Sequence, residues 1–367
     1  MLPPECASAV PEMVIETEFT GLYVPRLRAA GDTFYFQLGD GIHATTFTGG
    51  ADRLVVTGPA VPSLQKDGGM NNVSFADFWL DSTSITGVLG EAIYSAPIEG
   101  GPLRVTVGNL PQSHDEAVSM ILERGAYVQT GDDLYHATDD AEPWWPAHSL
   151  RRASRIGGVW AEVLPPDTLG RTNVQIDDGF LYYFGVPMPT AGAQSLFRLP
   201  LGQSTPVEHV GAFQSPRFYG FDGNLYVSEA GFGGGTLWRI RPDATREKLS
   251  LPPGVLALAS RIDEYAQLRQ GAVYNGSLYL ALRAFYQLPD DRRVTERYVI
   301  VRIDADGDKA EAVRCLPELP IDPDVPRDEF TTTLNDLVAT EDGVFVSVGR
   351  RGTRVLRERT HFFRVMP

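Results

Sequence analysis

Short apolar runs centred on an aromatic residue recur along the whole chain. Most of them directly follow a turn signal such as Asp178-Gly179 or Asn275-Gly276, and a turn dipeptide between two β-rich runs is a strong hairpin signal. We therefore interpret each run as the second strand of a hairpin. The seven runs are centred on Tyr35, Trp79, Tyr135, Tyr182, Tyr226, Tyr279 and Phe345, so neighbouring centres lie 44 to 66 residues apart.

A second recurring run lies downstream of the first and carries an arginine between apolar residues. Three of its copies are followed by a polar turn and a further strand-like run, such as Val207–Val210. Each repeat thus reads as four short antiparallel strands in a unit of roughly 40 to 60 residues, which is typical of a β-propeller blade. The copies of this second run are Leu196–Leu199, Leu237–Ile240, Ile300–Ile303 and Phe362–Val365.

The two ends of the chain predict how the propeller closes. The last repeat has strand-like runs at Leu337–Thr340, Val344–Val348 and His361–Val365, and it is one strand short. Met13–Phe19 alternates between apolar and polar residues, so we expect it to form the outer strand of the last blade. The prediction is an all-β chain with a tail over residues 1–11 and a single seven-bladed β-propeller domain, four antiparallel strands per blade, over residues 12–367.

By this pattern the chain resembles the seven-bladed β-propeller superfamily over nearly its whole length. It lacks the Gly-His and Trp-Asp signatures of WD40 repeats and the Gly-Gly pairs of kelch repeats in register. The resemblance is therefore to an architecture, without a named family. Propellers include enzymes, lectins and scaffolds, so the architecture implies no single function.

Charge and composition narrow the classes of partner. The chain has 32 Lys and Arg against 47 Asp and Glu, which gives a net charge of −15. Such a chain repels phosphate backbones, so nucleic acid and anionic membrane surfaces are not expected partners. No run of 18 apolar residues occurs, so we expect no membrane-spanning helix.

The N-terminal segment leaves two compartments open. It has neither a basic stretch nor a long apolar stretch, so it is not itself a signal peptide. Its proline and small residues favour a tether that follows a removed leader, which predicts an exported protein, periplasmic or extracellular; a cytoplasmic protein is the alternative. In an exported protein Cys6 and Cys315, the two cysteines, are able to pair as a disulfide; otherwise they are two unrelated thiols.

Polar residues recur at one position of the innermost strands. When the repeats are aligned on the hairpin turn, the residue six positions before the turn faces the channel mouth in each of them. The expected set is Arg26, Asn71 or Asn72, Ala126, Asn173, Arg217, Gln270 and Asp336 or Asn335. Six of the seven positions are polar, which indicates either a hydrated channel or a polar ligand site, with arginines for a carboxylate or phosphate and amides for hydroxyls.

A second candidate lies in the loop between the second and third strands of the third repeat. Trp144 and Trp145 are flanked by prolines, and His148 follows closely. Rigid aromatic area of this kind is typical of binding surfaces. The alternative is that both tryptophans pack against a neighbouring blade or cap the channel.

Signals for a metal or for catalysis are few. Asp304–Asp308 places carboxylates around a glycine, yet the position of the closing glutamate of an EF-hand is occupied by Cys315, so we interpret the segment as a hairpin turn. Amides and carboxylates at the inner strands resemble the calcium-dependent lactonase and paraoxonase-like propellers, whereas Arg26 and Arg217 would repel a dication. We expect no metal site and no cofactor, with Ca²⁺ as the alternative.

The leading hypothesis is a non-catalytic propeller that binds a small anionic or polyhydroxylated ligand, or a protein partner, at the channel mouth and the loop-rich face. The alternative is a hydrolase or lyase at the channel mouth, calcium-dependent in the manner of the lactonases. A bound ion or buried carboxylates with raised pKa at the mouth would favour the enzyme, and a broad apolar patch would favour the binder. No oligomeric state is predicted.

Overall fold

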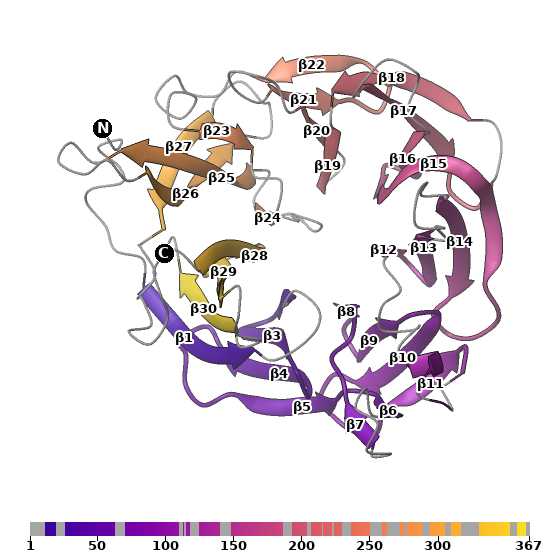
Figure 1. The fold of residues 1–367 in the computed structure, drawn as a ribbon, viewed down its shortest axis with the longest axis vertical. Helices are drawn as coiled ribbons and strands as arrows, with labels where there is room; N and C mark the ends of the chain where they lie inside the picture. The colour runs from indigo at the N-terminus through magenta and orange to yellow at the C-terminus, as the bar shows by residue number, and fades with distance from the viewer. Residues whose placement is uncertain are drawn as a thin grey trace. The chain divides into compact units, whose positions relative to one another are not determined.

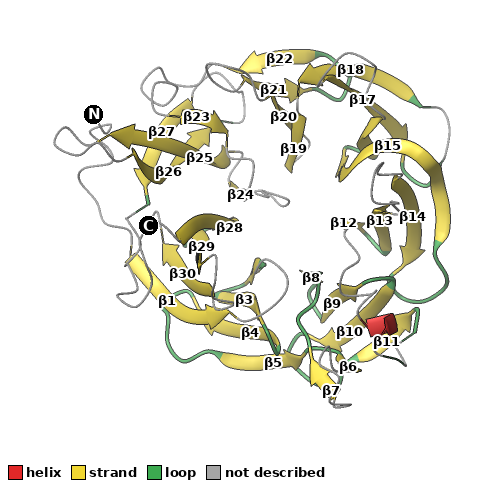
Figure 2. Cartoon of the chain, viewed as in Figure 1, coloured by secondary structure: helices red, strands yellow, loops and turns green. Residues whose placement is uncertain are grey.

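The protein is an all-β β-propeller of antiparallel sheets whose strands mostly follow the order of the chain (Figure 1; Figure 2). The computed structural model describes most of the chain. The described residues are 12–19, 26–62, 70–109, 113, 115–117, 125–139, 148–185, 193–203, 207–214, 216–221, 224–229, 236–249, 259–262, 272–274, 277–287, 294–304, 310–316, 330–352 and 358–364. Within these ranges no helix is long and apolar enough to cross a membrane.

The chain divides into two compact units, which we call the N-terminal unit (residues 20–46 and 50–213) and the C-terminal unit (residues 1–19, 47–49 and 214–367). The N-terminal unit begins with two four-stranded sheets and a small hairpin. The first sheet contains β2 (Leu27–Ala30), β3 (Thr33–Leu38), β4 (Gly41–Thr46) and β5 (Arg53–Thr57). The hairpin is β6 (Ala60–Pro62) with β7 (Met70–Asn72), and the second sheet contains β8 (Asp77–Leu80), β9 (Ser84–Leu89), β10 (Ala92–Pro97) and β11 (Arg104–Val107).

A seven-stranded sheet completes the N-terminal unit. It contains β12 (Gly125–Thr130), β13 (Asp133–Asp139), β14 (His148–Ser154), β15 (Ala161–Asp177), β16 (Phe180–Gly185), β17 (Ala193–Pro200) and β18 (Glu208–Gln214). The long strand β15 pairs with β14 through its first half and with β16 through its second half. Two predicted blades are joined in this way, so the described chain has six sheets of four or more strands where the sequence predicts seven blades.

The C-terminal unit contains three sheets. The first contains β19 (Pro216–Phe221), β20 (Asn224–Glu229), β21 (Thr236–Ile240) and β22 (Arg246–Leu249). The second contains β23 (Ala259–Ile262), β24 (Ala272–Tyr274), β25 (Ser277–Gln287), β26 (Val294–Ile303) and β27 (Ala310–Cys315). The third contains β28 (Phe330–Thr340), β29 (Gly343–Gly352), β30 (Glu358–Arg364) and the N-terminal strand β1 (Glu12–Phe19).

The N-terminal strand lies where the sequence predicts it. β1 pairs antiparallel with β30, with Met13 opposite Phe363 and Thr17 opposite Thr360. This pairing confirms that Met13–Phe19 forms the outer strand of the last sheet. Cys315 is buried in β27 and disulfide-bonded, while Cys6, the other cysteine of the sequence, lies outside the described residues.

One repeat is shifted relative to the sequence alignment. The run centred on Trp79 lies in the first strand of its sheet, β8, and not in the second strand as the other runs do. The hairpin turn follows this run: the Asp81 carboxylate accepts hydrogen bonds from the backbone N–H groups of Thr83 and Ser84 at 2.8 and 2.7 Å. This aspartate-capped turn replaces the Gly-containing dipeptide that marks most other repeats.

The two recurring sequence runs face each other across neighbouring strands. In five repeats the central aromatic of the second strand lies directly opposite the arginine of the third strand. The pairs are Tyr135–Arg152, Tyr182–Arg198, Tyr226–Arg239, Tyr279–Arg302 and Phe345–Arg364. In four of these repeats a glutamate of the fourth strand follows, either in register with the arginine (Glu247, Glu311 and Glu12) or ion-paired with it (Glu208).

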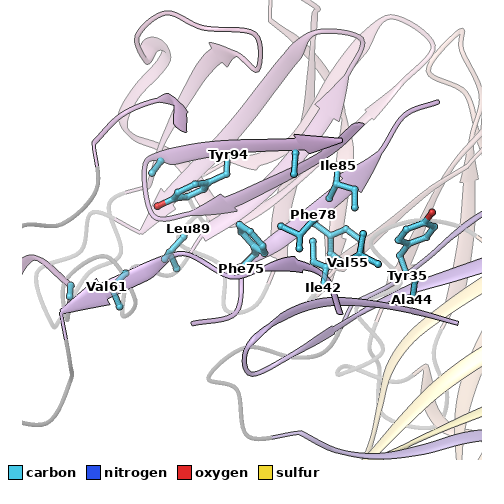
Figure 3. Close-up of a cluster of buried hydrophobic side chains, with 14 residues drawn as sticks. Tyr35, Ile42, Ala44, Val55, Val61, Phe75, Phe78, Ile85, Leu89 and Tyr94 are labelled. Carbon is cyan, nitrogen blue, oxygen red and sulfur yellow. The ribbon is translucent and has the colours of Figure 1, made fainter. Parts of the chain in front are cut away.

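Apolar side chains fill the space between successive sheets of the N-terminal unit. Figure 3 shows Tyr35 and Ile42 of the first sheet together with Phe78 and Ile85 of the second sheet. Phe75 is fully buried in this cluster, and its ring lies against Gly87, where a Cβ would have no room. A second cluster joins the β8–β11 sheet to the seven-stranded sheet through Trp79 and Tyr127. Face-to-face packing of this kind holds neighbouring blades together.

Candidate functional site

The polar position predicted on the first strands can be located by strand register. It is the residue opposite the fifth residue of the second strand. The backbone pairs at this position are Asp77–Val88, Ala126–Ala137, Arg217–Ser228 and Asp336–Ser347. In the first repeat Arg26 precedes β2, and its carbonyl accepts the N–H of Gln37, the fifth residue of β3. The first strands β8 and β12 lie along the same side of the N-terminal unit (Figure 1).

The second repeat supplies Asp77 at this position, where the sequence alignment gave Asn71 or Asn72. Asn72 lies instead in β7, exposed and paired with Ala60 in the small hairpin. The missed signal is the absence of a turn dipeptide before Phe78 and the presence of Asp81-Ser82-Thr83 after Leu80. An alignment on the Asp81-Ser82-Thr83 turn would have placed Asp77 at the same repeat position as Arg26, Arg217 and Asp336.

Arg26, Arg28 and Asp77 form a buried charged cluster where β2 and β8 meet. Arg28 Nη2 donates to Asp77 Oδ1 at 2.8 Å, and Arg26 Nε lies 3.6 Å from Asp77 Oδ2. The Asp77 side chain is 3% exposed and the two arginine side chains are 6% and 10% exposed. Buried charges are costly unless paired, so this cluster fixes the two first strands against each other.

Backbone groups complete the cluster. Arg28 also donates from Nε to the carbonyl of Phe78 at 3.1 Å and from Nη1 to its neighbour Leu27 at 2.9 Å, while its guanidinium lies over the Phe78 ring. Gln37 Nε2 donates to the carbonyl of Phe75. Where β2 and β8 meet, the N-terminal unit thus carries a set of buried polar groups over an apolar core.

Two aspartates at the same repeat position share one local geometry. Asp77 Oδ1 accepts the N–H of Phe78 at 2.8 Å, and Asp336 Oδ1 accepts the N–H of Leu337 at 3.0 Å. Both aspartates are 2% exposed. A carboxylate held by the next backbone N–H has a fixed direction, and in Asp77 the second oxygen is the one that faces Arg26.

The remaining predicted site residues fall into two groups. Asn173 lies in β15, Arg217 in β19 and His148 at the start of β14, so their place in the strands is described. Trp144, Trp145 and Gln270 lie outside the described residues. The binding roles predicted for all of these residues stay predictions.

The described residues contain no group of three or more His, Cys, Asp or Glu side chains arranged to hold a metal ion. His43 lies between two carboxylates, with Nδ1 2.7 Å from Asp52 Oδ2 and Nε2 2.9 Å from Asp40 Oδ1. His136 is fully buried and stacks on Tyr127 with ring centroids 4.1 Å apart. His43 and His136 are thus each held in place by neighbouring side chains.

The third-strand arginines have a different environment, best described at Arg198. Its guanidinium lies over the Phe180 ring at 4.3 Å and donates from Nε and Nη2 to Glu208 Oε2, both at 2.8 Å. Burial raises the pKa of Tyr182, although its hydrogen bond with Arg198 opposes this. Burial lowers the pKa of Arg198, but the hydrogen bonds with Tyr182 and Glu208 outweigh burial and raise the pKa overall. The side chain therefore stays charged.

Comparison with known proteins yields a fold and no family. No family model and no curated protein matches the chain. Among solved structures, an oligogalacturonate lyase in complex with manganese is 10% identical, with a TM-score of 0.52 over 91% of this chain and 86% of that one. At this identity the likeness shows a shared fold alone.

Two further structures are more distant. A quinonprotein alcohol dehydrogenase-like protein of Bacteroides thetaiotaomicron is 12% identical, with a TM-score of 0.41 over 96% of this chain and 89% of that one. A TolB protein of Agrobacterium tumefaciens is 12% identical, with a TM-score of 0.37 over 72% of this chain and 85% of that one. Neither likeness is strong enough to carry an argument.

Proposed function

We propose that the protein is a non-catalytic, ligand-binding β-propeller whose ligand-binding residues are polar residues at one repeat position of the first strands. The observation that carries the proposal is the buried charge at one repeat position: Arg26, Asp77 and Asp336 are each at most 5% exposed. Hydrophobic residues at these positions would stabilise a propeller equally well or better. The existing ion pairs hold the strands together, but an apolar pair would do so as well, so a ligand is our explanation of why charges occupy this position.

The expected ligand is a small anionic or polyhydroxylated molecule. Arginine binds carboxylates and phosphates through paired N–H groups, and aspartate or amide side chains accept and donate hydrogen bonds to hydroxyls. An acidic sugar combines both features. The fold shared with an oligogalacturonate lyase makes a short oligogalacturonate a sensible first probe.

We further propose that the seven repeats correspond to seven blades, with β15 crossing from the third blade to the fourth. The support is that the repeat pattern occurs twice in this sheet. The second-strand aromatics are Tyr135 of β13 and Tyr182 of β16, and Ala126 of β12 and Asn173 of β15 each lie six positions before the hairpin turn. Export of the protein with its leader removed is part of the same proposal. The disulfide at Cys315 supports it, because disulfides persist in oxidising compartments.

A thermal-shift screen with trigalacturonate, citrate and inorganic phosphate, followed by calorimetry on any hit, tests the proposal. Arg217→Ala is expected to weaken binding by about 1.5–3 kcal/mol, the scale of a hydrogen bond to a charged group. Arg241→Ala is the matched control, because Arg241 lies between β21 and β22 of the same sheet, is half-exposed and pairs with Glu247.

Three outcomes are informative in this screen. Weakened binding in Arg217→Ala alone supports the proposal. Equal binding by both variants, or no binding of any probe, contradicts it. Conversion of trigalacturonate to an unsaturated product would contradict the non-catalytic role and favour the lyase.

A further inference from the structure

The N-terminal strand is specified by the repeat pattern as the fourth strand of the last sheet. In the β19–β22 and β23–β27 sheets the third-strand arginine lies opposite a fourth-strand glutamate, as Arg239 opposite Glu247 and Arg302 opposite Glu311. In the last sheet Arg364 of β30 lies opposite Glu12 of β1. Strand β1 therefore fills a repeat position although it comes from the other end of the chain.

The C-terminal unit also contains a disulfide-bonded cysteine in a sheet next to the last one. Cys315 at the end of β27 is 4% exposed and disulfide-bonded. The sequence has one other cysteine, Cys6, which precedes the first residue of β1 by six positions. The sheets that contain β27 and β30 are neighbours, since β24 and β28 lie side by side.

We propose that a Cys6–Cys315 disulfide acts as a redox-sensitive lock that holds β1 on the edge of β30. With the bond intact, β1 is tethered at both of its ends, by Cys6 on one side and by the chain that leads to β2 on the other. Reduction by a dithiol cleaves the S–S bond, leaves two thiols on the protein and converts the dithiol to its cyclic disulfide. The strand is then held by its ladder hydrogen bonds alone.

The lock has a consequence for association between copies of the chain. When β1 leaves β30, the backbone of β30 becomes an open edge, which is a template for a strand from another molecule. The β1 strand of a second copy has the correct sequence for that edge. Exchange of identical strands between protomers is a known route to dimers, so the reduced protein is expected to form strand-exchanged oligomers.

The test compares oxidised and reduced full-length protein by hydrogen exchange, size-exclusion chromatography and thiol titration. The oxidised, denatured protein is expected to show no free thiol. Reduction is expected to speed amide exchange over residues 12–19 by about tenfold or more, to lower the melting temperature by roughly 5–10 °C and to produce concentration-dependent dimers.

Cys6→Ser provides the matched control, because it removes the disulfide and leaves the buried residue Cys315 in place. This variant is expected to match the reduced protein and to be insensitive to the dithiol. Two free thiols in the oxidised protein, or unchanged exchange over residues 12–19 after reduction, would overturn the proposal. A reduced protein that stays monomeric at every concentration, although its β1 exchanges faster, would overturn the strand-exchange step.

Discussion

The first two sheets and the later repeats place their buried charges differently. From the third repeat onward, an arginine of the third strand lies opposite the central aromatic of the second strand, as Arg198 does opposite Tyr182. In the first sheet Ala44 takes that place, and the arginine opposite Tyr35 is Arg28 of the first strand. Arg28 forms its ion pair with Asp77 of the next sheet, whereas Arg198 forms its ion pair with Glu208 within its own sheet.

This difference separates two roles of buried arginine in one architecture. The third-strand arginines recur opposite the central aromatic of the second strand, and Arg198 covers the Phe180 ring and binds Glu208 of the fourth strand, so they belong to the repeat. The first-strand charges vary from one repeat to the next, as Arg26, Asp77 and Ala126 show. Variation at a fixed position of a regular scaffold is what a site built on that scaffold requires.

The largest effect is expected from Asp77→Ala. The substitution removes the carboxylate that contacts both Arg26 and Arg28, and loss of one partner from a buried pair destabilises a protein by about 3–5 kcal/mol. Urea unfolding of the variant and the wild type measures the difference. A loss below about 1 kcal/mol would mean that the cluster does not hold β2 against β8.

Arg198→Ala is expected to have a smaller effect, about 2 kcal/mol. The variant loses a charge-assisted hydrogen bond and the packing over Phe180, but Glu208 is half-exposed and is solvated by water afterwards. The same unfolding experiment applies. If Arg198→Ala destabilises the protein more than Asp77→Ala, the ranking of the two regions is wrong.

Asp81→Asn tests the contribution of a partly buried carboxylate through the pH dependence of protein stability. Burial opposes ionisation of Asp81, but hydrogen bonds from Ser84, Thr83 and Arg155 outweigh it and hold the pKa of this carboxyl below its usual range. Since the folded pKa is depressed, the charge stabilises the protein above about pH 4 and this contribution is lost as the pH falls further. The variant should be about 1 kcal/mol less stable at pH 7. Its deficit should shrink below pH 4, and a deficit independent of pH would contradict the assignment.

The smallest effect is expected from Arg241→Ala. Its ion pair with Glu247 is exposed on both sides, and exposed pairs contribute about 0–1 kcal/mol. Unfolding in high and low salt measures this contribution. A loss as large as that of Arg198→Ala would show that burial does not separate the two classes of arginine.

Much of the fold follows from the sequence because propeller strands are short and local. Turn dipeptides and aromatic centres identified six of the seven second strands, and the arginine-containing runs are third strands in register with them. The alternating run at Met13–Phe19 identified β1. The β6–β7 hairpin and the continuity of β15 were missed, because both depend on how adjoining repeats pair and not on the pattern within one repeat.

The candidate site was predicted less completely. Counting back from the turn located Arg217 and Asp336 on the first strands and Arg26 directly before β2, because strand register carries over from one repeat to the next. It failed at Asp77, where the turn is capped by the Asp81 carboxylate and carries no glycine. The contact between Arg28 and Asp77 joins residues 49 positions apart in two sheets, so no local pattern reports it.

The claim that Arg217 of the first strands serves a ligand, while Arg198 of the third strands serves the fold, is tested most directly by one paired measurement. Calorimetric titration of the first ligand found in the screen is carried out on wild type, Arg217→Ala and Arg198→Ala. The account predicts that Arg217→Ala binds about tenfold or more weakly, while Arg198→Ala binds as tightly as the wild type despite its lower stability. Equal loss of affinity in both variants, or loss in Arg198→Ala alone, would contradict it.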